Sequence, residues 1–125
     1  MTITKTALVT GSSSGIGLAT AKVLASKGFN LMLHGIEAND IGQPLAAAIA
    51  AEYAVETDYC CADLAIPSQI ETLVQRTLTR FSRIDILVNN AGIQFTSPTV
   101  DFPPQKWDQL LAVNLSAPFH LIRLI

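Results

Sequence analysis

The stretch TGSSSGIG, residues 10–17, constrains the fold of this chain more than any other feature. Its glycines are separated by small residues, and it lies between the apolar segment ALVT and a segment with helical apolar spacing. Glycines permit backbone angles that other residues avoid, and they let the main chain approach a bound group closely. The stretch therefore predicts a strand, a loop and a helix in that order, with a candidate anion site at the helix N-terminus.

The rest of the chain alternates between strand and helix patterns. Short apolar segments bounded by turn residues predict strands over residues 7–10, 30–34, 56–61 and 84–88. Segments with helical apolar spacing predict helices that begin at Ile16, at about Pro44, at Pro67 and at about Gln105. Ser68 and Glu71 form a possible capping box for the third helix, and Pro118 lies inside the fourth. This order is typical of a parallel sheet covered by helices on both faces, within one domain over residues 1–125.

Composition excludes several classes of protein. Half of the 125 residues are apolar and 14% are charged, which is typical of a globular protein with a buried sheet. The net charge is -2 and the basic residues are scattered, so we expect no nucleic-acid binding. No apolar run reaches membrane-spanning length and residues 1–10 lack a signal-peptide pattern, so we expect a cytoplasmic protein without a membrane segment. The adjacent Cys60 and Cys61 lack metal-ligand spacing and are predicted to be small residues of a buried strand, and no metal is expected.

Two further motifs are predicted at the same edge of the sheet as the glycine-rich loop. Asp63 and Leu64 directly follow the third strand, and NNAG, residues 89–92, directly follows the fourth. Because α/β sheets bind ligands beyond the carboxyl ends of their strands, we expect the three loops to form one site. The alternative for the first loop alone is a tight turn in which Ser14 caps the helix and no ligand binds.

Together these motifs resemble those of the short-chain dehydrogenase/reductase family, whose cofactor half carries T-G-x-x-x-G-x-G, a D-L or D-V pair, N-N-A-G and a downstream Asn. The resemblance covers essentially all 125 residues. It implies an α/β fold, a Rossmann-type doubly wound parallel sheet with strand order 3-2-1-4 and about four helices, truncated to the N-terminal half of one domain. It also implies hydride transfer between a nicotinamide cofactor and a secondary alcohol or ketone, and a homotetramer for the full-length form.

The resemblance assigns cofactor contacts to residues of all three loops. The glycine-rich loop would hold the pyrophosphate and the adenosine ribose through Gly11, Ser13, Ser14, Gly15, Ile16 and Gly17. Asp63 and Leu64 would contact the adenine, and the alternative for Asp63 is a residue that only caps a turn. Asn89 is assigned a sheet-stabilising role. The ribose on the nicotinamide side would lie against Asn90, Ala91 and Gly92.

The residues near the adenosine 2′ position decide between NAD and NADP. A 2′-phosphate requires a cation, whereas a free hydroxyl suits an acidic acceptor. NADP-preferring members of the family place Lys or Arg in the glycine-rich loop or after the second strand, but this chain has serines at 12–14 and HGI at 34–36. We therefore expect NAD rather than NADP. Glu37 is a candidate acceptor for the ribose or else a solvated loop residue, and His34 is a candidate for the adenosine pocket.

The string NAGIQFTSP followed by DFPPQKWDQLLAVNLSAPFH looks most like the 3-hydroxybutyrate dehydrogenases within this family. That likeness implies a small hydroxy acid or ketone as substrate, with Gln94 helping to hold its carboxylate. The alternative for Gln94 is a loop residue that faces water. Asn114 matches the family's helix-kink asparagine, which positions the catalytic lysine through water, and the alternative is an ordinary solvated residue.

The proton-transfer pair of the family, a tyrosine followed four residues later by a lysine, does not occur in these 125 residues. Tyr53 is followed at that position by Thr57, and Tyr59 by Asp63. We therefore expect the N-terminal half of a dehydrogenase that is inactive by itself, with a bare apolar fourth strand and an unpartnered last helix. The alternatives are a non-catalytic NAD-binding module and a fragment that associates with full-length subunits.

Overall fold

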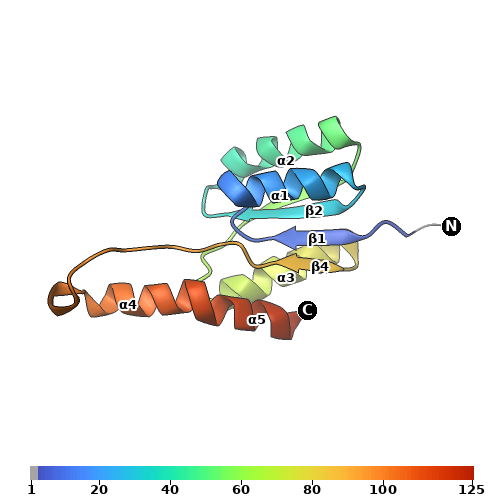
Figure 1. The fold of residues 1–125 in the computed structure, drawn as a ribbon. Helices are drawn as coiled ribbons and strands as arrows, with labels where there is room; N and C mark the ends of the chain where they lie inside the picture. The colour runs from blue at the N-terminus through green and yellow to red at the C-terminus, as the bar shows by residue number, and fades with distance from the viewer. Residues whose placement is uncertain (1–2) are drawn as a thin grey trace.

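The computed structural model describes residues 3–125, and a parallel sheet forms their central layer (Figure 1). The sheet has the order β3-β2-β1-β4, as predicted, and its strands are β1 (Thr6–Val9), β2 (Asn30–Gly35), β3 (Thr57–Cys61) and β4 (Ile86–Val88). The helices are α1 (Gly15–Ser26), α2 (Asn39–Tyr53), α3 (Pro67–Phe81), α4 (Pro104–Leu111) and α5 (Ala117–Leu124). A 3-10 turn, η1 (Thr99–Asp101), precedes α4, and a π-helical segment, η2 (Ala112–Ser116), joins α4 to α5.

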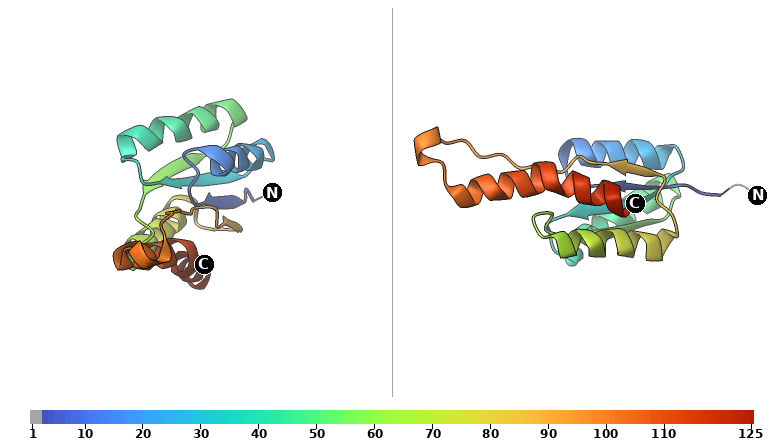
Figure 2. Two further views of the ribbon diagram at one scale, coloured as in Figure 1. Left: turned by 60° about the vertical axis from the view of Figure 1, so that its left-hand side comes forward. Right: turned by 90° about the horizontal axis from the view of Figure 1, so that it is seen from below.

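Helices cover both faces of the sheet, with α1 and α2 on one face and α3 and α5 on the other (Figure 2). The central strand β1 is buried along its whole length, and its side chains alternate between the two layers. Ala7 and Val9 pack in the core under α1 and α2, whereas Leu8 packs in the core formed with α3 and α5. This double burial explains why Ala7, Leu8 and Val9 of β1 are apolar without interruption.

The beginnings of two helices differ in one detail each from the sequence prediction. Helix α2 begins at Asn39, ahead of Pro44, because Gly42 packs against the ring of Tyr59 and Gln43 donates a 2.8 Å hydrogen bond to the Asp58 carboxylate. Helix α3 begins at Pro67 as predicted, but the capping box is wrong. Its N-cap residue is Ile66, whose side chain makes no capping bond to the described residues, and a proline at the first helical position needs no partner for an N–H.

The last helix widens into a π turn before Pro118. Proline has no N–H and its ring crowds the carbonyl four residues earlier, so a regular α-helix cannot pass through it undistorted. The segment η2 absorbs this irregularity immediately before α5. The predicted distortion of this helix is therefore confirmed.

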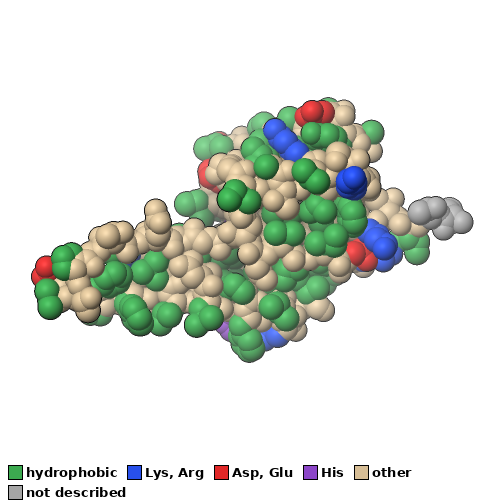
Figure 3. Space-filling model, in the orientation of Figure 1, with side chains coloured by type: hydrophobic (Ala, Val, Ile, Leu, Met, Phe, Trp, Pro, Cys, Tyr) green, Lys and Arg blue, Asp and Glu red, His purple; other side chains and the backbone are tan. Residues whose placement is uncertain are grey.

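Large apolar side chains remain exposed along the two last helices, in the lower left part of Figure 3. Leu115, Phe119 and Ile122 are 68%, 62% and 65% exposed, and Trp107 is 56% exposed. Strand β4 lies at the edge of the sheet, with β1 as its partner among residues 3–125, and its side chains are half-buried. Within those residues, no helix is long and apolar enough to cross a membrane.

Candidate functional site

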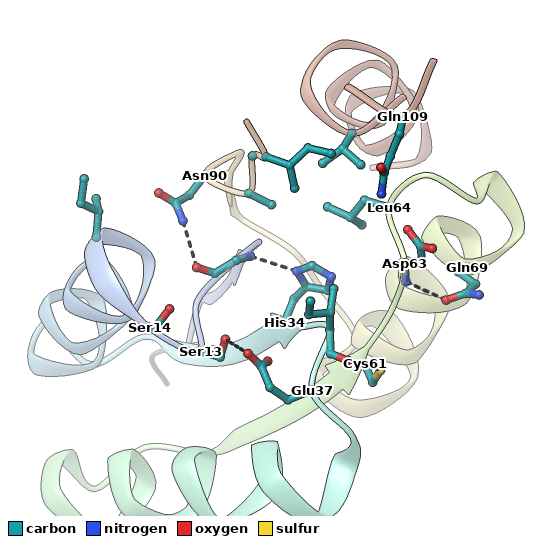
Figure 4. Close-up of a pocket in the computed structure, with 17 residues that line it drawn as sticks. Ser13, Ser14, His34, Glu37, Cys61, Asp63, Leu64, Gln69, Asn90 and Gln109 are labelled. Atoms are coloured by element: carbon teal, nitrogen blue, oxygen red, sulfur yellow. Dashed lines mark hydrogen bonds between the residues drawn. The ribbon is translucent and has the colours of Figure 1, made fainter. Parts of the chain in front are cut away.

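A cavity of about 710 Å³ lies at the carboxyl edge of the sheet, between the loops that follow the strands (Figure 4). Every predicted cofactor residue except Gly15 and Gly17 lines it, namely Gly11, Ser13, Ser14, Ile16, His34, Asp63, Leu64, Asn90, Ala91 and Gly92. The three loops predicted to form one site are therefore brought together. None of the residues that line the cavity is a Lys or an Arg.

The cavity also has walls that the sequence analysis did not assign. Its unassigned lining residues are Ile36, Cys61, Gln69, Ile93, Gln109 and Val113, and Glu37, the candidate acceptor for the ribose, lines the cavity as well. Gln109 and Val113 come from α4 and η2, whose place over the cavity depends on the long connection from β4 rather than on any local motif. The prediction that both cysteines are buried is wrong for Cys61, which is exposed at the end of β3, and correct for Cys60. Among the described residues, no cluster of His, Cys, Asp and Glu is arranged to hold a metal ion.

The positions of the glycines in the first loop exclude a side chain for different geometric reasons. Gly11 and Gly15 have φ angles of 61° and 59°, in the left-handed region that side chains disfavour. A Cβ on Gly11 would also lie 2.9 Å from the Cα of Ala91. A Cβ on Gly17 would overlap the carbonyl of Gly11 and the side-chain amide of Asn90. Gly17 thus lies beneath the cavity and lets the first loop pack against the loop after β4.

One serine of this loop stabilises the fold, and the other two line the cavity. Ser12 is buried, donates a 2.7 Å hydrogen bond to the Val9 carbonyl and accepts one of 2.9 Å from the His34 amide. Ser14 is the N-cap residue of α1, but its hydroxyl makes no capping bond to any described residue. The side-chain capping bond of the alternative interpretation is therefore absent among the described residues, and ligand binding by this loop stays a prediction. Ser13, Ser14 and Ile16 line the cavity at the N-terminus of α1, where a helix has N–H groups without helical partners, and such a place suits an anion.

His34 joins the loops after β1 and β3. The amide of Gly11 donates to its Nδ1 at 2.9 Å, so Nε2 carries the proton and donates to the Ala62 carbonyl, also at 2.9 Å. The imidazole is almost completely buried, and this burial lowers its pKa below 6.5. A neutral His34 therefore fixes the position of the glycine-rich loop through its bond to Gly11.

Glu37 is held at the cavity wall rather than solvated freely. Its Oε1 accepts a 3.0 Å hydrogen bond from Ser13 (Figure 4). Its Oε2 lies 3.1 Å from the hydroxyl of Tyr59. Its own backbone N–H lowers the pKa of the carboxyl first, and the Ser13 and Tyr59 hydroxyls lower it further. An ionised acceptor therefore lies at the end of the cavity near β2 and β3.

Asp63 and Asn90 each combine a structural bond with a place in the cavity wall. Asp63 accepts a 2.9 Å hydrogen bond from the Ala65 amide, so it caps a turn and also lines the cavity. The side-chain amide of Asn90 donates to the carbonyls of Thr10 and Gly11 at 3.1 and 3.0 Å. The stabilising role predicted for Asn89 is therefore wrong, because Asn89 is exposed and Asn90 makes these bonds.

Asn114 and Gln94 lie outside the cavity. Asn114, in η2, accepts a 2.9 Å hydrogen bond from the Ile93 amide and donates a 2.8 Å bond to the Ile93 carbonyl. It is thus not an ordinary solvated residue, since it fixes the segment that follows NNAG. Gln94 is exposed in that segment and makes no side-chain hydrogen bond to the described residues, so its contact with a substrate stays a prediction.

Comparison with known proteins identifies this architecture. Residues 5–125 match the family model described as short chain dehydrogenase. The chain belongs to the short-chain dehydrogenase family. D-beta-hydroxybutyrate dehydrogenases of Rhizobium meliloti and Cupriavidus necator are 45% and 43% identical to it over 97% and 96% of its length. The chain spans about half of each of these relatives, 47% and 46%.

Solved structures of short-chain dehydrogenases confirm the Rossmann-type sheet. A metagenomic short-chain oxidoreductase in complex with NADP aligns with a TM-score of 0.88 and 35% identity, over 97% of this chain and 54% of that one. A 3-oxoacyl-[acyl-carrier protein] reductase from Brucella melitensis in complex with NAD aligns with a TM-score of 0.88 and 29% identity, over 100% of this chain and 49% of that one. The family is one of oxidoreductases, and its members bind a nicotinamide dinucleotide.

Proposed function

We propose that this short-chain dehydrogenase chain is the NAD-binding half of an enzyme that transfers a hydride between nicotinamide and a small hydroxy acid or ketone, the pair 3-hydroxybutyrate and acetoacetate. The observation that carries the proposal is the cavity that the loops after β1, β3 and β4 build together. It lies at the carboxyl edge of a parallel sheet, where α/β folds bind dinucleotides.

Each loop has a separate part in binding. The N-terminus of α1 with Ser13 and Ser14 takes the pyrophosphate, because its amides and helix dipole favour negative charge. Asp63 and Leu64 take the adenine, and residues 90–92 take the ribose on the nicotinamide side. The bound nicotinamide ring supplies the hydride acceptor or donor. The protein residues orient it and shield it from water.

The charge of the cavity supports NAD over NADP. No lining residue is a Lys or an Arg, and the ionised Glu37 carboxylate accepts hydrogen bonds but repels a phosphate. A missing charge-assisted contact of roughly 1.5 to 3 kcal/mol corresponds to about a ten- to hundredfold weaker binding of NADP.

The names of the hydroxybutyrate dehydrogenase relatives support the substrate, and Gln94 is the residue that we assign to its carboxylate. Neither Tyr53 nor Tyr59 is followed four residues later by a lysine, so the proton-transfer pair is assigned to sequence outside these 125 residues. The 125-residue chain alone is accordingly expected to bind NADH without turning over a substrate.

Fluorescence titration with NADH and NADPH tests the binding, and NADH formation from NAD and D-3-hydroxybutyrate tests the reaction. We expect the full-length form to bind NADH more tightly than NADPH and to oxidise the hydroxy acid. We expect the 125-residue chain to bind NADH without oxidising the hydroxy acid. Failure of the full-length form to bind either dinucleotide at millimolar concentration would overturn the proposal. Binding without turnover of any hydroxy acid would identify a non-catalytic NAD-binding module instead.

A further inference from the structure

We propose that Tyr59 is a positioning residue for cofactor discrimination: it holds the carboxylate of Glu37 at the cavity wall, so that a free ribose 2′-hydroxyl is accepted and a 2′-phosphate is rejected. The inference rests on the proposed function, because it assumes that the adenosine of a dinucleotide lies at this end of the cavity. It adds a buried residue of β3 that does not itself line the cavity.

The phenol of Tyr59 contacts both the main chain and the side chain of Glu37. Its hydroxyl donates to the Glu37 carbonyl at 2.7 Å and lies 3.1 Å from Oε2 of the same residue. The single phenolic proton is thus shared by two acceptors of one residue. A tyrosine that only filled the core would need one partner for its hydroxyl, whereas this one fixes the path of the loop and the direction of the carboxylate together.

Two glycines make room for this arrangement. A Cβ on Gly35, the last residue of β2, would lie 2.7 Å from the Tyr59 hydroxyl and 2.9 Å from the Ser13 hydroxyl, and would overlap the Glu37 carboxylate. The carboxylate is therefore folded back over the end of the strand. A Cβ on Gly42 of α2 would overlap the Tyr59 ring, so the ring packs directly on the helix backbone.

Tyr59 is held more tightly by its surroundings than Glu37, so Tyr59 positions Glu37 and not the reverse. Tyr59 is completely buried between β2 and α2, and its ring has no room to move. Glu37 is a half-buried residue in the loop between β2 and α2, where an unrestrained glutamate would populate several rotamers. The fixed phenol therefore sets the loop carboxylate, and Ser13 completes the set by donating to the other oxygen.

A carboxylate fixed in this way discriminates better than a mobile one. A free glutamate can swing into water, where a 2′-phosphate is tolerated because the charge is screened. Held between two hydroxyl donors, the carboxylate stays beside the cavity and is preorganised to accept a hydrogen bond. Removing the phenolic hydroxyl is therefore expected to reduce selectivity for NADH without removing the carboxylate.

The test compares dissociation constants for NADH and NADPH in the full-length protein and its Tyr59→Phe, Glu37→Gln and double variants. We expect Tyr59→Phe to lower the preference for NADH about three- to tenfold, in proportion to one lost hydrogen bond, and Glu37→Gln to lower it more. In the double variant the Tyr59 change should have no further effect, because a residue that acts through Glu37 has nothing left to position. Tyr53→Phe, at the other end of α2 and outside the cavity, is the matched control and should leave the ratio unchanged.

Thermal unfolding of each variant separates a folding defect from a change in selectivity. If Tyr59→Phe does not fold, Gly35→Ala replaces it, since the added methyl group displaces the carboxylate and should lower the same ratio. An unchanged ratio in Tyr59→Phe, or equal effects of Tyr59→Phe with and without Glu37→Gln, would overturn this inference. Both results leave the proposed function standing, because that function is tested by dinucleotide binding and hydroxy-acid turnover in the wild-type protein.

Discussion

At the scale of single residues, the shape of the loops that line the cavity depends on buried side chains. His34 accepts the Gly11 amide and donates to the Ala62 carbonyl, so one imidazole joins two of the loops that line the cavity. This works only in the neutral form, because a protonated ring has no acceptor for the Gly11 amide. The geometry of the glycine-rich loop is therefore linked to the charge of a histidine.

His34 should make the protein less stable in mildly acidic solution. Burial lowers its pKa in the folded state below 6.5, so the unfolded chain takes up the proton first. The stabilisation is complete above the unfolded pKa and is lost as the pH falls from there toward the folded pKa, by at most about 1.4 kcal/mol per pH unit. Urea unfolding at about pH 7.5 and about pH 5.5 measures the loss.

The variant His34→Asn is the control for this prediction. Its side-chain oxygen can accept the Gly11 amide, but it does not titrate, so the free energy of unfolding should change less between the two pH values. The pKa values of the Glu37 and Asp58 carboxyls are lowered from 4.5 and 3.8, so these groups change the free energy of unfolding only at pH values below this window. Equal losses in the wild type and His34→Asn would contradict the prediction.

Gly17→Ala and Gly15→Ala should differ, although both change a glycine of one loop. The new methyl group at position 17 would overlap the Gly11 carbonyl and the Asn90 amide, whereas at position 15 there is open space and only the positive φ is strained. We expect Gly17→Ala to cost roughly 1–3 kcal/mol and to weaken NADH binding strongly, and Gly15→Ala to cost about 1 kcal/mol. Chemical denaturation and NADH titration would show the difference, and equal costs would refute the packing role of Gly17.

At the scale of elements, the widened turn η2 has a use beyond accommodating Pro118. It lies between α4 and α5, and Asn114 within it makes two hydrogen bonds to the backbone of Ile93. The helix is thereby attached to the segment that follows β4. The loop on one side of the cavity and the helix above it consequently behave as one unit.

Replacing Asn114 by Ala should release this attachment. Two hydrogen bonds of modest net value are lost, so we expect a destabilisation of about 1–2 kcal/mol and faster hydrogen exchange at the Ile93 amide. Asn89→Ala is the matched control, because Asn89 is an exposed amide of the same loop. Unchanged exchange at Ile93 in Asn114→Ala would show that the loop is held by other contacts.

The sequence predicts those elements whose cause is local. The alternation of strands and helices and the meeting of three loops at one edge follow from apolar periodicity, short connections and glycine spacing, whereas the strand order is implied by the family resemblance. The structure agrees with both. The start of α2 was not predictable, because it depends on Gly42 packing against Tyr59 from a distant strand. The contribution of Gln109 to the cavity was also not predictable, because it depends on where the chain after β4 places α4.

At the scale of the whole molecule, several large apolar side chains of α4, η2 and α5 remain exposed to solvent. Trp107, Leu115, Phe119 and Ile122 are all more than half exposed on one long helical segment. Figure 3 shows hydrophobic side chains at the surface of this part of the molecule. Isolated exposed apolar residues are common, but a continuous row of them is typical of a surface that another element covers.

The 125-residue chain by itself should therefore self-associate. We expect sedimentation velocity to show association that increases with protein concentration, and Phe119→Glu to reduce it, because a charge would have to be buried in the contact. Val23→Glu is the control, since Val23 is 58% exposed on α1, which covers the opposite face of the sheet. Monomeric behaviour of the unaltered chain at all concentrations would contradict the prediction.

The contacts between Thr10 and Asn90 also set the order in which the molecule can be assembled. They join parts of the chain that are 80 residues apart, and they hold the first loop in its final shape. A nascent polypeptide that has left the ribosome only as far as α3 can pair β2 with β1 and β3, and His34 can already hold Gly11 and Ser12, but the loop still lacks its bonds to Asn90. The carboxyl edge of the sheet therefore reaches its final shape only after β4 has been made, because these bonds are among the longest-range contacts of the chain.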